Sequence, residues 1–117
     1  MTQLTTATTE PISRVQIARY AGAVGDFNPI HLDDAFAAKA GLPSVIAHGP
    51  LTLALILDLI VAQLGAEALS SFDARLRAPV FPGDQLTVAP SEDGVEVRNA
   101  SDTVVATVTI SRRSENG

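Results

Sequence analysis

The stretch LTLALILDLIVAQL, residues 51–64, decides how this chain folds. Thr52, Asp58 and Gln63 are its only polar residues, and a helix that is apolar on nearly every side is a buried helix. The stretch is too short and too often interrupted by polar residues to span a membrane. We therefore expect the rest of the chain to wrap around one long buried helix.

Strand-like alternation of apolar and polar residues fills the chain after this helix. The predicted strands are residues 72–80, 85–89, 95–99 and 104–111. Turn signals at residues 82–84 (PGD) and 92–94 (EDG) separate them, and residues 99–103 join the last two as a hairpin. The β-prone residues 4–9 add a fifth strand near the start of the chain. This order predicts an α+β domain with an antiparallel sheet wrapped around the helix.

Two shorter helices precede the long one. Ser13 is a suitable N-cap for a helix over residues 14–23. A second helix over residues 32–40 begins with Asp33 and Asp34, which complement the positive end of the helix dipole. The predicted apolar faces are Val15, Ile17, Ala18 and Ala21 in the first helix, and Phe36, Ala37 and Ala40 in the second.

The composition is that of one globular domain. The chain has 117 residues, of which 46% are hydrophobic and 18% charged. Its net charge of −5 argues against broad binding of nucleic acid, and without cysteine it has neither disulfides nor thiolate chemistry. Residues 1–10 lack a secretory signal pattern, and we expect a cytoplasmic protein that is not bound to membrane. We expect one domain over residues 1–117, with flexible tails at 1–3 and 114–117.

The loop between the two short helices reads GDFNPIH, residues 25–31. Neither a helix nor a strand would place Asp26 and His31 on one face at their spacing, so the loop itself must bring them together. Pro29 helps, because it holds the preceding residue out of the helical region. A neutral imidazole at His31 is able to take a proton from water. The plain structural alternatives are a turn cap for Asp26 and an exposed helix start for His31.

The long helix begins beside a second candidate group. Pro50 fits its first position and Gly49 the cap before it. Backbone N–H groups point out of a helix N-terminus, and a glycine there leaves their approach open. Such an end is able to stabilise negative charge that develops on a carbonyl oxygen.

Several motifs in this order resemble the MaoC-like hydratases and dehydratases, also called (R)-specific enoyl-CoA hydratases. The similarity runs through YAG at residues 20–22, GDFNPIH at 25–31 and LD at 32–33. It continues in AHGPL at residues 47–51 and in APVFPGD at 78–84. Together these motifs cover most of the chain between residues 12 and 111.

The resemblance implies the hot-dog fold, in which a sheet wraps around one long helix and two such domains form a dimer with sites at the interface. It also implies addition of water to the α,β double bond of an acyl thioester carried by CoA or acyl carrier protein, or the reverse, with neither metal nor cofactor. Asp26 and His31 would bind and activate the water, with the division between acid and base left open. Asp26 would return a proton if burial raises its pKa. The N–H of Gly49 would meet the thioester carbonyl.

We further expect Asn28, His48, Pro50, Arg75 and Arg77 to contact the substrate. For His48 the structural alternative is that it holds its loop, and for the two arginines it is a solvated strand face. The chain departs from the family at two places: Pro50 stands where an apolar residue such as Met is common, and Leu57 where some members carry a supporting Ser. These departures bear on substrate preference and assembly.

Other functions remain as alternatives at this point. The chain is either a homodimeric enzyme or the catalytic half of a heterodimer. A non-catalytic domain that binds acyl thioesters is the alternative from another class, because a fold does not fix a function. A thioesterase would need a carboxylate on the buried helix, and Asp58 is the one candidate.

Overall fold

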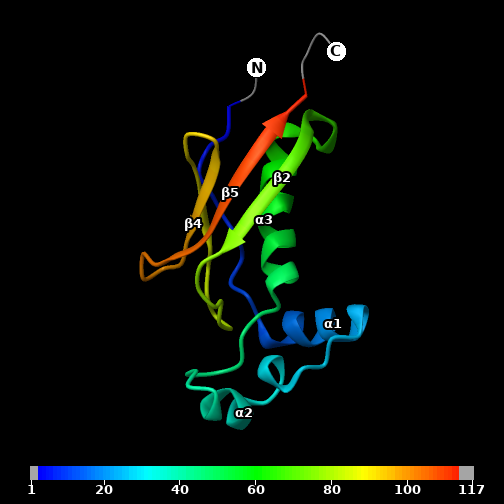
Figure 1. Ribbon diagram of the computed structural model, residues 1–117, viewed down its shortest axis with the longest axis vertical. Coiled ribbons are helices and arrows are strands. Elements are labelled where there is room, and N and C mark those ends of the chain that lie inside the picture. Colours follow the sequence, from blue (N-terminus) through cyan, green and yellow to red (C-terminus); the bar gives the residue numbers. More distant parts are fainter. Residues whose placement is uncertain (1–2, 114–117) are drawn as a thin grey trace.

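A long helix, α3 (Gly49–Leu64), runs along a five-stranded antiparallel sheet (Figure 1). The computed structural model describes residues 3–113. The strands are β1 (Ala7–Thr8), β2 (Leu69–Leu76), β3 (Thr87–Pro90), β4 (Gly94–Arg98) and β5 (Val104–Arg112). Their order across the sheet is β1-β3-β4-β5-β2, so β1 and β2 are the two edges. A short 3-10 helix, η2 (Ala66–Ala68), links α3 to β2.

The core lies between α3 and one face of the sheet. Strand register places Val97 of β4 opposite Val88 of β3 and Ala106 of β5, so three buried side chains form one row. Ile56 and Ile60 of α3 are buried in the same cluster. Because side chains alternate across each strand, this single row fixes which residues of three strands face the helix.

The remaining helices gather at one end of the molecule, away from the sheet (Figure 1). They are α1 (Arg14–Val24), the short 3-10 helix η1 (Pro29–His31) and α2 (Asp34–Lys39). The Ser13 hydroxyl caps α1 by accepting from the Gln16 N–H at 3.0 Å, as the sequence predicted. No helix within residues 3–113 is long and apolar enough to cross a lipid bilayer.

The predicted α+β architecture, with a sheet curved around one helix, is confirmed. Some helix and strand boundaries differ from those predicted. The strand expected over residues 72–80 is β2, Leu69–Leu76, and Pro79 beyond its end has no N–H to extend the ladder. The predicted cap was also one residue off: His48 is the N-cap of α3 and Gly49 its first residue. The predicted tails lie outside the described residues, except for Gln3.

The helices bury less of their apolar surface than the sequence predicted. In the single chain, Ala54, Asp58 and Ala62 are exposed, because these positions, four apart, share the side of α3 away from the sheet. In α1 only Ile17 and Ala21 are buried, and in α2 only Ala37. The other residues of the predicted apolar faces are exposed: Val15, Ala18, Phe36 and Ala40.

The close contact of β4 with β5 at Gly94 generates a stability prediction. A Cβ at this residue would overlap the Val108 carbonyl oxygen and lie 3.1 Å from the Thr109 Cα. Gly94→Ala should therefore lower the free energy of unfolding by about 1–3 kcal/mol, as overpacking does, when measured by denaturant titration. Gly22→Ala is the control, because its Cβ would meet open space within α1, and it should be neutral or stabilising. A Gly94→Ala protein as stable as wild type would contradict the register.

Candidate active site

The loop after α1 is held by two short hydrogen-bonded turns. Gly25 ends α1 in the left-handed region, with φ 74°, which favours glycine. The Asp26 Oδ1 then accepts from the Asn28 N–H at 3.3 Å, and the Asn28 Oδ1 accepts from the Ile30 N–H at 3.1 Å. Asx turns of this kind fix a loop locally. They leave the other carboxylate oxygen of Asp26, Oδ2, 3.9 Å from the His31 Nε2.

The tautomer of His31 follows from its contacts. Its Nδ1 lies 2.8 Å from the Ile46 carbonyl oxygen, which can only accept, so Nδ1 carries the hydrogen. In the neutral ring, Nε2 then keeps a lone pair, and this atom faces Asp26. The His31 side chain is 11% exposed and that of Asp26 51% exposed. The structure thus brings together the two residues that sequence reasoning paired, and it leaves the Asp26 side chain half exposed in the single chain.

His48 completes the cluster from the other side. Its side chain is 1% exposed, and its ring stacks on that of His31, with centroids 3.7 Å apart and planes inclined by 22°. Its Nε2 donates to the Asp26 backbone carbonyl at 3.0 Å. The Tyr20 ring packs against His48 at a centroid distance of 4.9 Å. Sequence reasoning missed Tyr20 as part of this cluster, since it lies on α1 and only the fold brings it here.

Asp26, His31 and His48 are also the described residues that could hold a metal ion, since their ligating atoms lie within 4.8 Å of one another. The hydrogen bonds of these residues argue against metal binding. The Nε2 of His48 already carries a hydrogen for the Asp26 carbonyl, and a metal needs a lone pair there. The donor set as folded therefore fits acid–base chemistry better than metal binding.

A groove of about 330 Å³ opens beside the start of α3. Its lining includes Gly49, Thr52 and Arg77. A Cβ at Gly49 would come 2.7 Å from the Leu76 Cδ1, so glycine leaves the groove room at this point. The first N–H groups of a helix have no intrahelical acceptor, and that of Gly49 is therefore available to a ligand. Buried Thr52 is a lining residue that the sequence did not single out, because it reads as one polar break in an apolar helix.

The other predicted contact residues have varied surroundings. Asn28 caps η1 with its side chain, Pro50 is exposed as the second residue of α3, and Arg75 is exposed on β2. Arg77 follows β2 and donates from Nε to the Thr107 Oγ1 at 3.3 Å. That these residues bind substrate stays a prediction.

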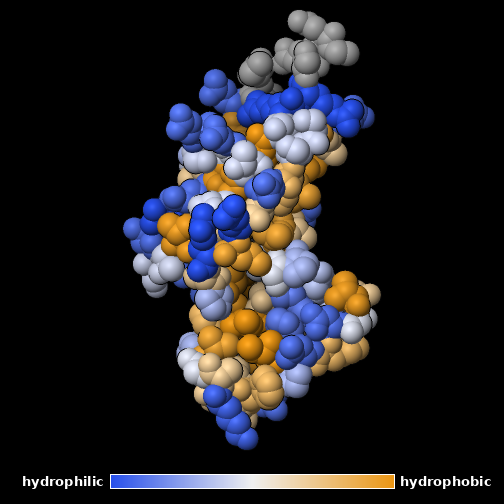
Figure 2. All heavy atoms as spheres, in the orientation of Figure 1, coloured by the Kyte–Doolittle hydropathy of each residue, from blue (hydrophilic) through white to orange (hydrophobic). Residues whose placement is uncertain are grey.

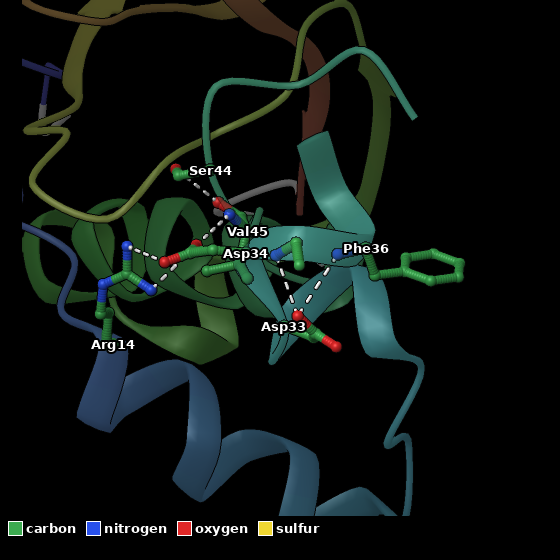
Figure 3. Close-up of polar contacts among 7 residues, drawn as sticks. Arg14, Asp33, Asp34, Phe36, Ser44 and Val45 are labelled. Atoms are coloured by element: carbon green, nitrogen blue, oxygen red, sulfur yellow. Dashed lines mark hydrogen bonds and ion pairs between the residues drawn. The ribbon is translucent and has the colours of Figure 1, made fainter. Parts of the chain in front are cut away.

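An ion pair joins the two short helices, and a hydrogen bond links its carboxylate to the segment that orients His31 (Figure 3). The Asp34 carboxylate accepts from the Arg14 Nη1 at 3.1 Å and from the Val45 N–H at 3.1 Å. The pKa of Asp34 lies below its ordinary value, chiefly because of the hydrogen bond from Arg14 and to a smaller extent because of that from Val45. Val45 precedes Ile46, whose carbonyl holds His31. Figure 3 also shows Asp33 capping α2 by accepting from the N–H groups of residues 35 and 36.

The chain belongs to the MaoC-like domain family, which it matches over residues 2–114. The family resemblance that the sequence motifs indicated is therefore confirmed. An (R)-specific enoyl-CoA hydratase of Aeromonas caviae is 38% identical over 74 residues, covering 62% of this chain and 55% of that protein. The enoyl-CoA hydratase ChsH3 of Mycobacterium tuberculosis is 41% identical over 73 residues, covering 60% of this chain and 26% of that protein. The chain thus spans from a quarter to about half the length of these curated relatives.

The fold has a matching solved structure. The R-hydratase PhaJ1 of Pseudomonas aeruginosa, in its unliganded form, superposes with a TM-score of 0.77 at 29% identity. The match covers 93% of this chain and 77% of that one. The predicted hot-dog arrangement is therefore confirmed.

The lowered pKa of Asp34 generates a prediction on stability and pH. Because the folded state holds the proton less tightly than the unfolded state, the contribution of Asp34 to stability is complete above its ordinary pKa. It is lost as pH falls through the lowered value. We expect Asp34→Asn to have a lower thermal midpoint than wild type at neutral pH, and a smaller gap to wild type at an acidic pH below the ordinary pKa of the carboxyl. Arg14→Gln, which removes the main cause, should show a weaker pH dependence. A gap between wild type and Asp34→Asn that is equal at both pH values would contradict this assignment.

Proposed function

We propose that this chain interconverts trans-2-enoyl and (R)-3-hydroxyacyl thioesters of CoA or acyl carrier protein by syn addition or removal of water. The observation that carries the proposal is the pairing of Asp26 with His31, whose hydrogen-bonded Nδ1 leaves Nε2 unprotonated opposite a carboxylate oxygen. Family membership and the hydratase names of the relatives support the same reaction class. The predicted cytoplasmic location stays a prediction.

The 3.9 Å gap between the His31 Nε2 and the Asp26 Oδ2 suits a substrate water that contacts both atoms. In the forward reaction His31 accepts a proton from this water while the oxygen bonds to Cβ of the enoyl group. Cα gains a proton from the Asp26–His31 pair on the same face, so that the sum of the steps is one water added. The elements of water leave through the same pair in the reverse direction.

Gly49 supplies the second half of the chemistry. As Cβ is attacked, negative charge develops on the thioester oxygen, and we assign its stabilisation to the N–H of Gly49 at the start of α3. The groove beside Gly49 gives the thioester its access. Arg77 lies in the groove wall and would meet a phosphate of the carrier in this proposal, whereas Arg75 is not part of that wall.

We propose that the working form is a dimer. The outer edge of β2 pairs with no strand among residues 3–113, and an open edge tends to recruit a second chain. Leu76 at the end of β2 is 48% exposed, and Phe27, beside the half-exposed Asp26, is 61% exposed. A partner that covers these groups would also shield the site from bulk water. A second copy of this chain is the first candidate, and a different chain of the same fold is the alternative.

The proposed reaction is tested by hydration of crotonyl-CoA, with the product's stereochemistry determined. Asp26→Asn and His31→Ala should each lower kcat by about 100- to 10,000-fold, as expected when an acid–base group is lost, with circular dichroism unchanged. Asp58→Asn is the matched control, because this exposed carboxylate lies on the outer side of α3. It should keep wild-type hydration, whereas a thioesterase that depends on Asp58 would lose hydrolysis.

Near-wild-type hydration in Asp26→Asn or His31→Ala would refute the assignment of the pair. A non-catalytic binding domain would instead bind acyl-CoA tightly and catalyse no proton exchange at Cα in deuterated water.

The assembly is tested by the mass of the purified protein in solution. We expect an active species of about twice the chain mass of 12.2 kDa. A stable homodimer that hydrates crotonyl-CoA would exclude the need for a different partner. An inactive monomer that gains activity only with a second, different chain would establish the heterodimer instead.

A further inference from the structure

The three proposed catalytic residues, Asp26, His31 and Gly49, all adjoin His48, although the His48 side chain itself is buried. Its ring stacks on His31 at 3.7 Å, its Nε2 donates to the backbone of Asp26 at 3.0 Å, and it is the N-cap residue directly before Gly49. At 1% exposure it is one of three buried polar or charged residues among residues 3–113. A polar ring is costly to bury, so its position calls for an explanation beyond packing.

The bond from His48 to Asp26 is one of three hydrogen bonds that tie the loop of residues 25–31 to the segment before α3, the other two joining Ile30 and His31 to Ile46. The hydrogen bonds that Asp26 and Asn28 make to the loop's own N–H groups are local, within two residues along the chain. These local turns set the shape of the loop but not its place in the molecule. The Asp26 carbonyl, by contrast, is bound by a ring from a residue 22 positions along the chain. This bond, together with that from the Asp26 N–H to the Ala21 carbonyl, holds the backbone that carries the carboxylate.

The ring of His48 is poorly suited to transfer a proton, although its Nε2 lies 4.0 Å from the Asp26 Oδ2. Its Nε2 hydrogen is committed to the Asp26 carbonyl, and its other nitrogen, Nδ1, is buried without a protein partner among the described residues. A proton added at Nδ1 would thus meet no acceptor there, and an acid–base group must exchange protons with water or substrate. His31 and Tyr20 pack against the ring. The contacts of His48 therefore suit a residue that acts through its neighbours.

We propose that His48 is a positioning residue that sets the separation of the Asp26 carboxylate from His31, through its hydrogen bond to the Asp26 carbonyl and its stack on the His31 ring. The inference rests on the proposed hydration, and it replaces the direct substrate contact that the sequence predicted for His48. It implies that the two histidines carry their hydrogens on opposite nitrogens, Nδ1 in His31 and Nε2 in His48.

Two variants separate the hydrogen bond from the ring contact. His48→Phe keeps a ring against His31 but loses the donor, whereas His48→Gln keeps an N–H donor at a similar reach. Because a misplacement of about 1 Å can cost about 100-fold in rate, we expect His48→Phe to lower kcat for crotonyl-CoA by about 100-fold with KM little changed. His48→Gln should recover most of this loss. Ile60→Val, a buried change further along α3, controls for general destabilisation and should keep the wild-type kcat.

A kcat in His48→Phe equal to that of wild type would overturn the proposal. So would a raised KM at unchanged kcat, because that result would make His48 a substrate contact.

Nuclear magnetic resonance provides a readout that needs no turnover. The chain has two histidines, so their ring nitrogens are readily assigned, and opposite tautomers are expected in wild type. Backbone order parameters for residues 26–31 should be near 0.85 in wild type and His48→Gln, and should fall towards about 0.6 in His48→Phe. A hydrogen on Nδ1 of His48, or a loop equally rigid in His48→Phe, would overturn the proposal.

These two readouts distinguish the inference from the reaction on which it rests. If wild type hydrates no enoyl thioester, the proposed function fails, and the tautomers and loop order still decide whether His48 positions Asp26. If His48→Phe does not fold, the wild-type tautomers and the kcat of His48→Gln carry the test. A folded His48→Gln protein with a mobile loop and a kcat as low as that of Asp26→Asn would then overturn it.

Discussion

The site depends on the short backbone segment before α3, residues 45–48. Hydrogen bonds tie it to four other parts of the chain: Val45 to Asp34, Ile46 to both Ile30 and His31, Ala47 to Val80, and His48 to Asp26. Each bond removes freedom from the segment, and together they make its position a property of the whole fold. Because the Ile46 carbonyl belongs to this segment, the tautomer of His31 is set by the backbone rather than by another side chain.

The apolar core and the candidate site lie at different ends of the molecule. The sheet and α3 bury most of the apolar core, while α1, η1 and α2 carry the polar loop at the other end, where Figure 2 shows hydrophobic residues reaching the surface. Asp26 stays half exposed there, and Phe27, Leu32 and Phe36 are exposed in the same region of the sequence. A rigid core thus supports a site that a single chain leaves open, which is the physical argument for a partner.

Much of the architecture was predictable because partly buried helices and strands place apolar residues at regular intervals along the sequence. The apolar run over residues 51–64, the strand alternation after it and the Ser13 cap are all local signals, and the structure contains each of them. The predictions of burial were wrong where exposure depends on how the elements pack together rather than on the local sequence. Val15 and Phe36 are apolar and on helices, yet exposed, because the described chain offers nothing large enough to cover short helices at its end.

The sequence by itself determined the helix-in-sheet architecture, the likeness to a family, and the candidates Asp26, His31 and Gly49, because periodicity, turn chemistry and motif spacing are local properties. Only the tertiary structure decided that His48 stacks on His31 and binds Asp26, that Tyr20 and Thr52 border the site, and which nitrogen of His31 is free. These relations join residues from α1, η1 and the start of α3. Hydrogen-bond direction and ring stacking depend on distances that no spacing along the chain encodes.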